Sequence, residues 1–84
     1  MEKNSIRVKI EGTTATGKST IMWSIIKNLI EHGIEVEMVN LDYKDIDHLQ
    51  HAMEHDITLI QRLDAIKDKT KVIVEEVQLN KDKL

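Results

Sequence analysis

The apolar residues of this chain recur with two different periods, and the period changes along the sequence. Residues 5–11 alternate between apolar and charged side chains, and so do the first residues of 35–41, which is typical of β-strands. Elsewhere the apolar residues recur every three or four positions, which is typical of amphipathic helices. A third apolar stretch follows at 71–79. The order of these patterns predicts a β-α-β-α-β arrangement.

The first helix is predicted to begin at Gly17 or Lys18 and to end at His32. Gly33 follows at the position where a left-handed residue commonly ends a helix. Between Ile46 and Ile66 the pattern fits either one long helix or two short ones. A break near 54–56 is favoured, because an aspartate at position 56 would be a good N-cap for a second helix. The apolar positions of this stretch are Ile46, Leu49, Met53, Ile57, Ile60, Leu63 and Ile66.

The strand at 71–79 differs from the other two because it contains the uninterrupted run Val72-Ile73-Val74. A run without alternation indicates burial on both faces, so this strand is predicted to be central. The predicted fold class is α/β, a minimal three-stranded parallel sheet of order 2-3-1. Right-handed crossovers would then pack helices on both faces. The alternative is order 1-2-3 with the helices on one face.

Residues 12–19 are the most informative segment of the chain. They match the phosphate-binding pattern G-x-x-x-x-G-K-[ST] completely and lie between a predicted strand and a predicted helix. The backbone N–H groups of such a loop and of the first helical turn point inward, and the helix dipole favours negative charge. The matching residues are Gly12, Thr13, Thr14, Ala15, Thr16, Gly17, Lys18 and Ser19.

Lys18 supports this interpretation independently of the motif. It stands at the start of a predicted helix, where the dipole disfavours a cation. A lysine at that position makes sense if an anion shares the site. The sequence alone also allows a glycine-rich turn that binds nothing.

At these residues the chain resembles the P-loop NTPases, most closely their small kinase-like branch. The resemblance implies that Gly12 allows a sharp exit from the strand and that Gly17 lets the backbone approach the phosphates. It implies that Lys18 reaches the β- and γ-phosphates, that Ser19 is a Mg²⁺ ligand, and that Thr20 touches the α-phosphate. The implied ligand is ATP or GTP with Mg²⁺, bound at residues 12–20.

Two functions of different class remain open. One is a weak phosphotransferase or NTPase, with Lys18 in its catalytic site. The other is a non-catalytic nucleotide- or phosphate-binding module that acts by binding a protein partner. Larger family members carry further strands, a lid and a base-binding segment, for which 84 residues leave no room. The resemblance therefore supports binding more than catalysis, and a second copy or a protein partner is an alternative source of the missing parts.

Three acidic residues are candidates for the chemistry of this site. Asp42 follows the strand at 35–41, at the carboxyl end where parallel sheets bind ligands. The resemblance implies a catalytic role for it, and the simpler interpretation is a turn residue. Glu75 and Glu76 follow Val72-Ile73-Val74, where the family carries its Walker B acid. The sequence does not separate the two, and one of them on a solvated face is the simpler interpretation.

Histidine and tryptophan offer two further candidates. His48, His51 and His55 would share a stripe on one helix and form a transition-metal site, but their acidic neighbours indicate a solvated polar face. Trp23 falls near the edge of the first helix's apolar arc. That position predicts a half-buried packing residue, with a base-stacking platform or an interface anchor as alternatives.

Length and composition limit the remaining possibilities. We expect residues 1–84 to form a single domain. The net charge of −3 argues against non-specific nucleic-acid binding, and the absence of cysteine excludes disulfides. No apolar run approaches the length of a membrane span, and residues 1–4 lack a signal-peptide core. These features predict a cytoplasmic protein with no membrane partner.

Overall fold

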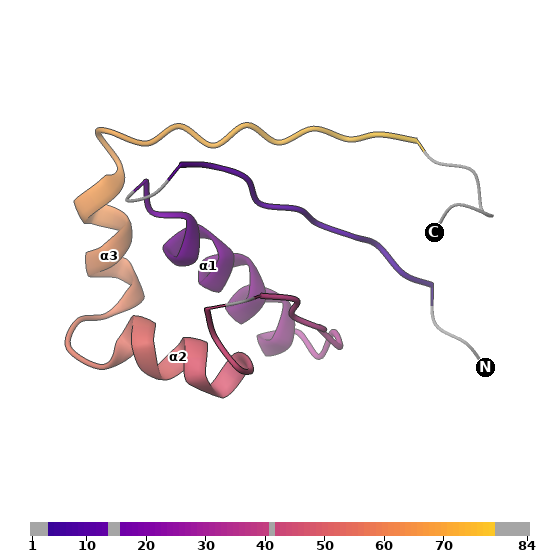
Figure 1. Ribbon diagram of the computed structural model, residues 1–84, viewed down its shortest axis with the longest axis horizontal. Helices are drawn as coiled ribbons and strands as arrows, with labels where there is room; N and C mark the ends of the chain where they lie inside the picture. The colour runs from indigo at the N-terminus through magenta and orange to yellow at the C-terminus, as the bar shows by residue number, and fades with distance from the viewer. Residues whose placement is uncertain (1–3, 14–15, 41, 79–84) are drawn as a thin grey trace.

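The computed structural model describes residues 4–13, 16–40 and 42–78 of the chain. Within these residues the regular elements are three helices, namely α1 (Lys18–Glu31), α2 (Ile46–Glu54) and α3 (Leu59–Ile66). α1 contacts both α2 and α3 (Figure 1). The remaining described residues form turns and extended segments.

The predicted boundaries of the first helix are confirmed to within one residue. α1 ends in a Schellman motif, in which Gly33 N–H donates to Ile30 O at 3.0 Å and Ile34 N–H donates to Leu29 O at 3.1 Å. Gly33 has φ +81°, a left-handed conformation that glycine adopts without strain. The sequence pattern identified the helix end correctly because this cap is a purely local interaction.

The stretch from residue 46 to residue 66 forms two short helices, so the predicted break is confirmed. The predicted cap at Asp56 is wrong. Thr58 is the N-cap of α3, because it forms a reciprocal capping box with Gln61: Gln61 N–H donates to Thr58 Oγ1 at 3.2 Å, and Thr58 N–H donates to Gln61 Oε1 at 2.8 Å. Two satisfied backbone donors outweigh the single bond that an isolated aspartate offers.

Arg62 fixes the corner between α2 and α3. Its guanidinium donates from Nε to the backbone oxygen of Met53 and from Nη2 to that of Ala52 at 3.1 Å. The last carbonyls of a helix have no partner within the helix, so a side chain that reaches them satisfies acceptors that would otherwise need water. A residue of α3 thereby closes the end of α2.

The core lies between α1 and α2. It consists of Trp23 and Ile26 from α1 and Leu49 and Met53 from α2, all less than a tenth exposed. Partly buried apolar residues surround this cluster: Met22, Val36, Met38, Tyr43, Ile46, Ala52 and Leu59.

A polar network seals the edge of this core. Trp23 donates from Nε1 to Glu54 Oε2 at 3.2 Å, and Lys27 Nζ lies 2.8 Å from Glu54 Oε1. The Glu54 hydrogen bond and charge raise the pKa of Lys27 above its usual value. One carboxylate therefore joins two residues of α1 to the end of α2.

The prediction of an α/β fold with a three-stranded parallel sheet is wrong for the described part of the chain, which is all-helical. Residues 4–13, 34–40 and 70–78 are extended, but they form no strand ladder with one another. Sheet order and the distribution of helices over its faces therefore do not apply. The predicted central strand is the clearest failure, since Val72, Ile73 and Val74 are 50%, 79% and 90% exposed.

The reason is that alternation specifies an extended backbone and does not specify a partner. In residues 34–40, Val36 and Met38 pack against the helical core while Glu37 is exposed. Packing on helices thus accounts for the alternation there without a sheet. Neither the N-terminal nor the C-terminal segment is drawn as a strand arrow in Figure 1.

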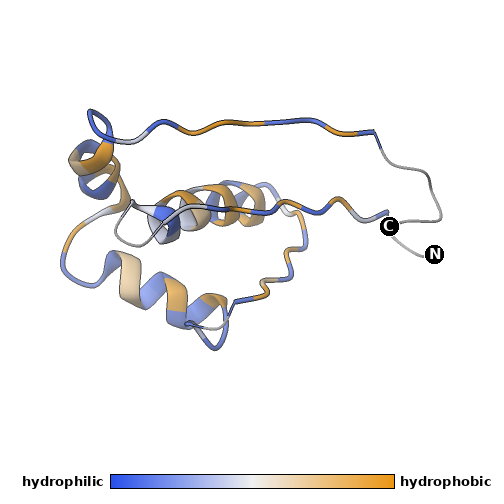
Figure 2. Cartoon of the chain, turned by 45° about the horizontal axis from the view of Figure 1, so that its top comes forward, coloured by the Kyte–Doolittle hydropathy of each residue, from blue (hydrophilic) through white to orange (hydrophobic). Residues whose placement is uncertain are grey.

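These two extended segments give the molecule an open form. The Cα radius of gyration is 14.2 Å, against about 12 Å for a compact chain of this length. Residues 4–13 and 70–78 run in opposite directions along the long axis, and both carry apolar side chains (Figures 1 and 2). The most exposed of these side chains are Ile6, Val8, Ile73, Val74 and Val77.

The N-cap of α2 gives the first prediction. Asp45 Oδ1 accepts from His48 N–H at 2.9 Å and lies 2.6 Å from His48 Nδ1, and these hydrogen bonds lower the pKa of Asp45 below its ordinary value of 3.8. A lowered folded-state pKa contributes stability above the unfolded value, which is lost as the pH falls through the folded value. We expect acid to destabilise the native protein more than Asp45→Asn, which keeps an acceptor oxygen and does not titrate. Thermal melts followed by circular dichroism between about pH 5 and pH 2 measure this difference, and equal acid sensitivity of the two proteins would contradict it.

Candidate functional site

The glycine-rich motif and the start of α1 coincide. Gly17 is the N-cap of α1, and Lys18 is its first helical residue. No side chain caps this end and no acidic residue lies in its first turn, among the residues that the structure describes. The first intrahelical bond runs from Ile21 N–H to Gly17 O at 3.0 Å. The N–H groups at the start of a helix precede any such bond and carry its positive dipole end.

Only glycine fits at position 17. Its φ of +91° lies in the left-handed region, which costs other residues about 1–2 kcal/mol. A Cβ built on Gly17 would also lie 2.8 Å from Ile66 Cδ1 and 3.3 Å from Ile66 Cγ2. The close approach of α3 therefore requires the absence of a side chain, in addition to the backbone conformation.

The two ends of the loop are folded toward one another. A Cβ built on Gly12 would lie 3.1 Å from Lys18 Cγ and 3.1 Å from Thr16 Oγ1. Thr16 in turn donates from its hydroxyl to Thr13 O at 2.8 Å. The aliphatic stem of Lys18 therefore lies against Gly12. Thr14 and Ala15, which were also predicted to bind phosphate, lie outside the described residues.

The segment that follows α3 contacts the loop through a hydrogen bond. Thr70 donates from its hydroxyl to Thr16 O at 3.0 Å, across 54 positions of sequence. Thr70 and Ile66 contact the loop, and neither contact was predicted from the sequence. No spacing or composition signal connects residues 66 and 70 to the motif, so the sequence alone offered no way to find them.

The predicted phosphate-binding residues differ in accessibility. Gly12, Thr13 and Lys18 are exposed, and Ser19 is partly exposed. Thr20 is 7% exposed, and its hydroxyl lies 4.0 Å from Met53 Sδ in the core. The Thr20 side chain is therefore directed away from the loop.

Asp42 belongs to a local turn. Asn40 Oδ1 accepts from Asp42 N–H at 2.6 Å and from Tyr43 N–H at 3.1 Å, and the Asp42 side chain is exposed. An asparagine that accepts from the backbone two residues onward is a common turn former. This geometry agrees with the simpler interpretation of Asp42, and its catalytic role stays a prediction.

Glu75 and Glu76 are exposed residues of the C-terminal extended segment. That segment leaves the loop at Thr70 and runs along the molecule (Figure 1). At about 3.3 Å per residue, Glu75 lies roughly 16 Å along the chain from Thr70. The extended geometry thus gives no support to a Walker B role, which stays a prediction.

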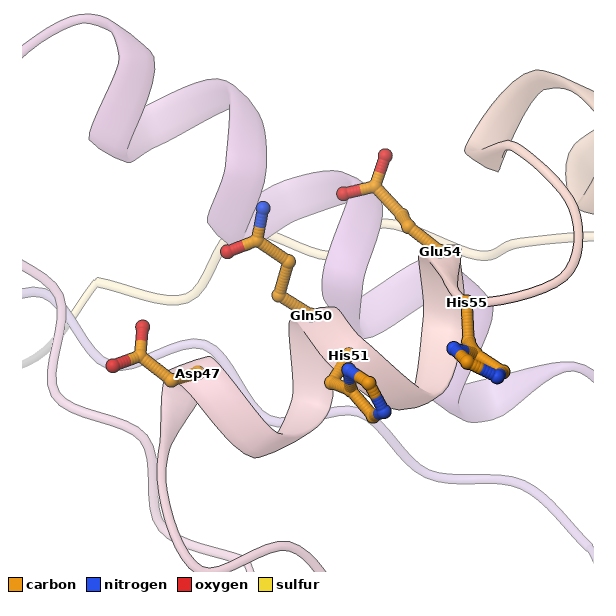
Figure 3. A pocket seen from close by; sticks show the side chains of 5 residues that line it. All are labelled: Asp47, Gln50, His51, Glu54 and His55. Carbon is orange, nitrogen blue, oxygen red and sulfur yellow. The ribbon is translucent and has the colours of Figure 1, made fainter.

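The three histidines of the predicted metal site lie on or next to α2 and are exposed; they are His48, His51 and His55. His48 pairs with Asp45, and the rings of His51 and His55 lie 4.8 Å apart. These two histidines line a surface hollow of about 430 Å³ together with Asp47, Gln50 and Glu54 (Figure 3). No group of three or more potential metal ligands occurs among the described His, Asp and Glu residues, so the solvated polar face is the better description.

Trp23 is not available for stacking on a base. It is 1% exposed, and its indole N–H is bonded to Glu54. Trp23 lies at the centre of the core, whereas the sequence pattern predicted a half-buried position.

No protein-family model, no curated protein and no solved structure matches this chain. None of the helices in the described ranges combines the length and the hydropathy needed to cross a membrane. A function for this chain is therefore inferred from the glycine-rich motif and its surroundings.

Proposed function

We propose that residues 12–19 bind the phosphate groups of a nucleoside triphosphate such as ATP or GTP. The Thr20 side chain, which is buried against the core, is left out of this proposal. The observation that carries the proposal is that α1 begins inside the motif, at Lys18, with a glycine N-cap that leaves the first-turn N–H groups without a side-chain cap. A helix end of this kind offers several donors and a positive dipole to one anion.

Lys18 adds a positive charge to the same end of the helix. Its side chain is exposed and its stem lies against Gly12. Without an anion, a lysine in the first turn is disfavoured by the helix dipole. With a phosphate bound, the ammonium group, the dipole and the loop N–H groups all act on the same charge, and this cooperation supports binding.

The described residues of this site offer one side-chain ligand for Mg²⁺. The partly exposed Ser19, in the first turn of α1, is the residue that would hold it. Mg²⁺ usually keeps several waters and binds through one or two protein ligands plus substrate phosphates, so one hydroxyl is compatible with it. The ion would neutralise negative charge on the phosphates when the nucleotide is bound.

Binding is better supported than phosphoryl transfer. The described contacts of Asp42 are local, and the extended segment carries Glu75 away from the loop. The proposal therefore favours the non-catalytic alternative, a module whose nucleotide-bound state is recognised by a protein partner. The exposed apolar residues of the two extended segments support an association role.

Thermal unfolding with and without Mg-ATP tests this function. At a ligand concentration 100 times Kd, we expect stabilisation of about 2.7 kcal/mol. Lys18→Ala removes an exposed cation and no core contact, so it should leave the free protein as stable as before and weaken binding at least about tenfold. Lys44→Ala, an exposed lysine outside the motif, is the matched control.

Two results would count against the proposal. The first is an unchanged melting temperature at millimolar nucleotide. The second is a Lys18→Ala variant that binds as tightly as the Lys44→Ala control. Phosphate release measured on the same samples distinguishes a binding module from an NTPase.

A further inference from the structure

Residues 71–75 form an exposed segment that is complementary to a second copy of itself running in the opposite direction. A cation, Lys71, begins it and an anion, Glu75, ends it, with Val72, Ile73 and Val74 between them. Every one of these residues is exposed. Their backbone forms no ladder with any other described residue, so its N–H and C=O groups are available to an incoming strand.

We propose that two copies of this chain associate by antiparallel pairing of residues 71–75 about a two-fold axis at Ile73. In that register Lys71 of each copy lies opposite Glu75 of the other, and Val72 lies opposite Val74. Ile73 lies opposite its own equivalent. The same contact is made twice, as a closed two-fold dimer requires.

The charged and the apolar positions together favour this register and direction. Opposite charges facing one another across an antiparallel pair stabilise it, and like charges destabilise it. A slip of one residue in one direction places Lys71 opposite Val74 and loses the charge pairing. A slip in the other direction pairs Lys71 with Glu76 but places Val72 opposite the charge of Glu75. Parallel pairing would place each Lys71 opposite a second Lys71. Antiparallel pairing centred on Ile73 is therefore the arrangement that satisfies both the charged and the apolar positions.

The N-terminal extended segment fits the same assembly as an outer strand. A two-stranded ribbon is marginal in water, whereas three or more strands with an apolar face are stable. Residues 4–13 run opposite to 70–78 (Figures 1 and 2), and one antiparallel register gives two opposite-charge pairs and two apolar pairs, although it also places Lys9 opposite Ile73 and Ile6 opposite Glu76. The opposed pairs are then Arg7–Glu75, Val8–Val74, Ile10–Val72 and Glu11–Lys71.

In such a dimer, the apolar residues at even positions of both segments would share one face. Val8, Val72 and Val74 are at least half exposed in the single chain. Two copies would gather them, with Ile10, into one continuous patch whose burial is favourable. This accounts for β-branched residues on segments whose described side chains are largely exposed in the monomer.

Sedimentation equilibrium over a range of protein concentrations tests the proposal. We expect the native chain to form dimers and no larger species. Lys71→Glu and Glu75→Lys each replace two attractive pairs per dimer with two repulsive ones, so each should raise the dimer Kd by at least about tenfold. Both positions are exposed, so circular dichroism should show an unchanged helix content.

Mixing the two variants tests whether the opposite-charge pairs themselves hold the dimer together. A heterodimer of Lys71→Glu with Glu75→Lys regains two opposite-charge pairs, and its Kd should return to within about threefold of the native value. Lys44→Glu, a charge reversal outside the segment, should associate like the native chain. A native chain that stays monomeric, variants that associate normally, a mixture that does not recover, or polydisperse aggregates would each overturn the proposal. The experiment needs no nucleotide, so its outcome is independent of the proposed function.

Discussion

Leu49→Ala is expected to destabilise the protein by about 2–5 kcal/mol. Leu49 is fully buried and belongs to the cluster that joins α2 to α1. Its truncation removes apolar contacts and leaves a cavity between the two helices. A chain of 84 residues has a total stability of about 4–12 kcal/mol, so the variant would lose a large fraction of it.

Urea unfolding followed by circular dichroism measures this loss. Ile60→Ala is the matched control, because Ile60 is 73% exposed on α3 and surface substitutions usually change stability by less than about 0.5 kcal/mol. A Leu49→Ala variant no less stable than Ile60→Ala would show that the contact between α1 and α2 is not the core.

Gly17→Ala is expected to have the second large effect. The left-handed backbone costs an alanine about 1–2 kcal/mol, and overpacking against Ile66 adds about 1–3 kcal/mol. Gly33→Ala separates the two contributions, because Gly33 has φ +81° and a Cβ there would meet nothing within 4 Å. We expect Gly17→Ala to be clearly more destabilising than Gly33→Ala in urea unfolding.

A double variant tests the origin of the difference. Ile66→Val removes Cδ1, the atom that a Cβ on residue 17 would approach to 2.8 Å. Gly17→Ala should therefore cost less in the Ile66→Val background than in the native one, a non-additivity expected of residues in contact. Equal costs in the two backgrounds would mean that α3 does not restrict position 17.

The helices were predictable because their signals are local. The end of α1 depends on Gly33 and its near neighbours, and the break between α2 and α3 was predicted from a capping residue near it, since the spacing of apolar residues fits one helix or two. The mistaken cap shows the limit of this approach. Asp56 is a good N-cap by residue type, yet the reciprocal bonds between Thr58 and Gln61 decided where α3 begins.

The absence of a sheet from the described residues could not be predicted. Strand pairing is a property of two segments, whereas alternation is a property of one. Val36 alternates with Glu37 because it packs on helices. The run Val72-Ile73-Val74 satisfies the pattern of a buried strand but is exposed in the single chain. An apolar side chain indicates that its burial is favourable. It does not indicate whether the surface that buries it belongs to the same molecule.

The position of the motif at the start of α1 was predictable, and the contacts around the loop were not. The motif could be identified from its spacing alone, and α1 does begin at Lys18. The contacts that shape the loop come from Ile66 and Thr70, and loop closure over such a distance leaves no periodic trace in a sequence.

The burial of Trp23 has a consequence for how this protein can be observed. It is the chain's single tryptophan, and it is enclosed between α1 and α2 with its indole N–H on Glu54. Its fluorescence therefore reports the docking of these two helices, whereas far-ultraviolet ellipticity reports helical backbone in all three. In two-state unfolding both signals change together. Any separation between them measures the population of chains whose helices persist after α2 has left α1.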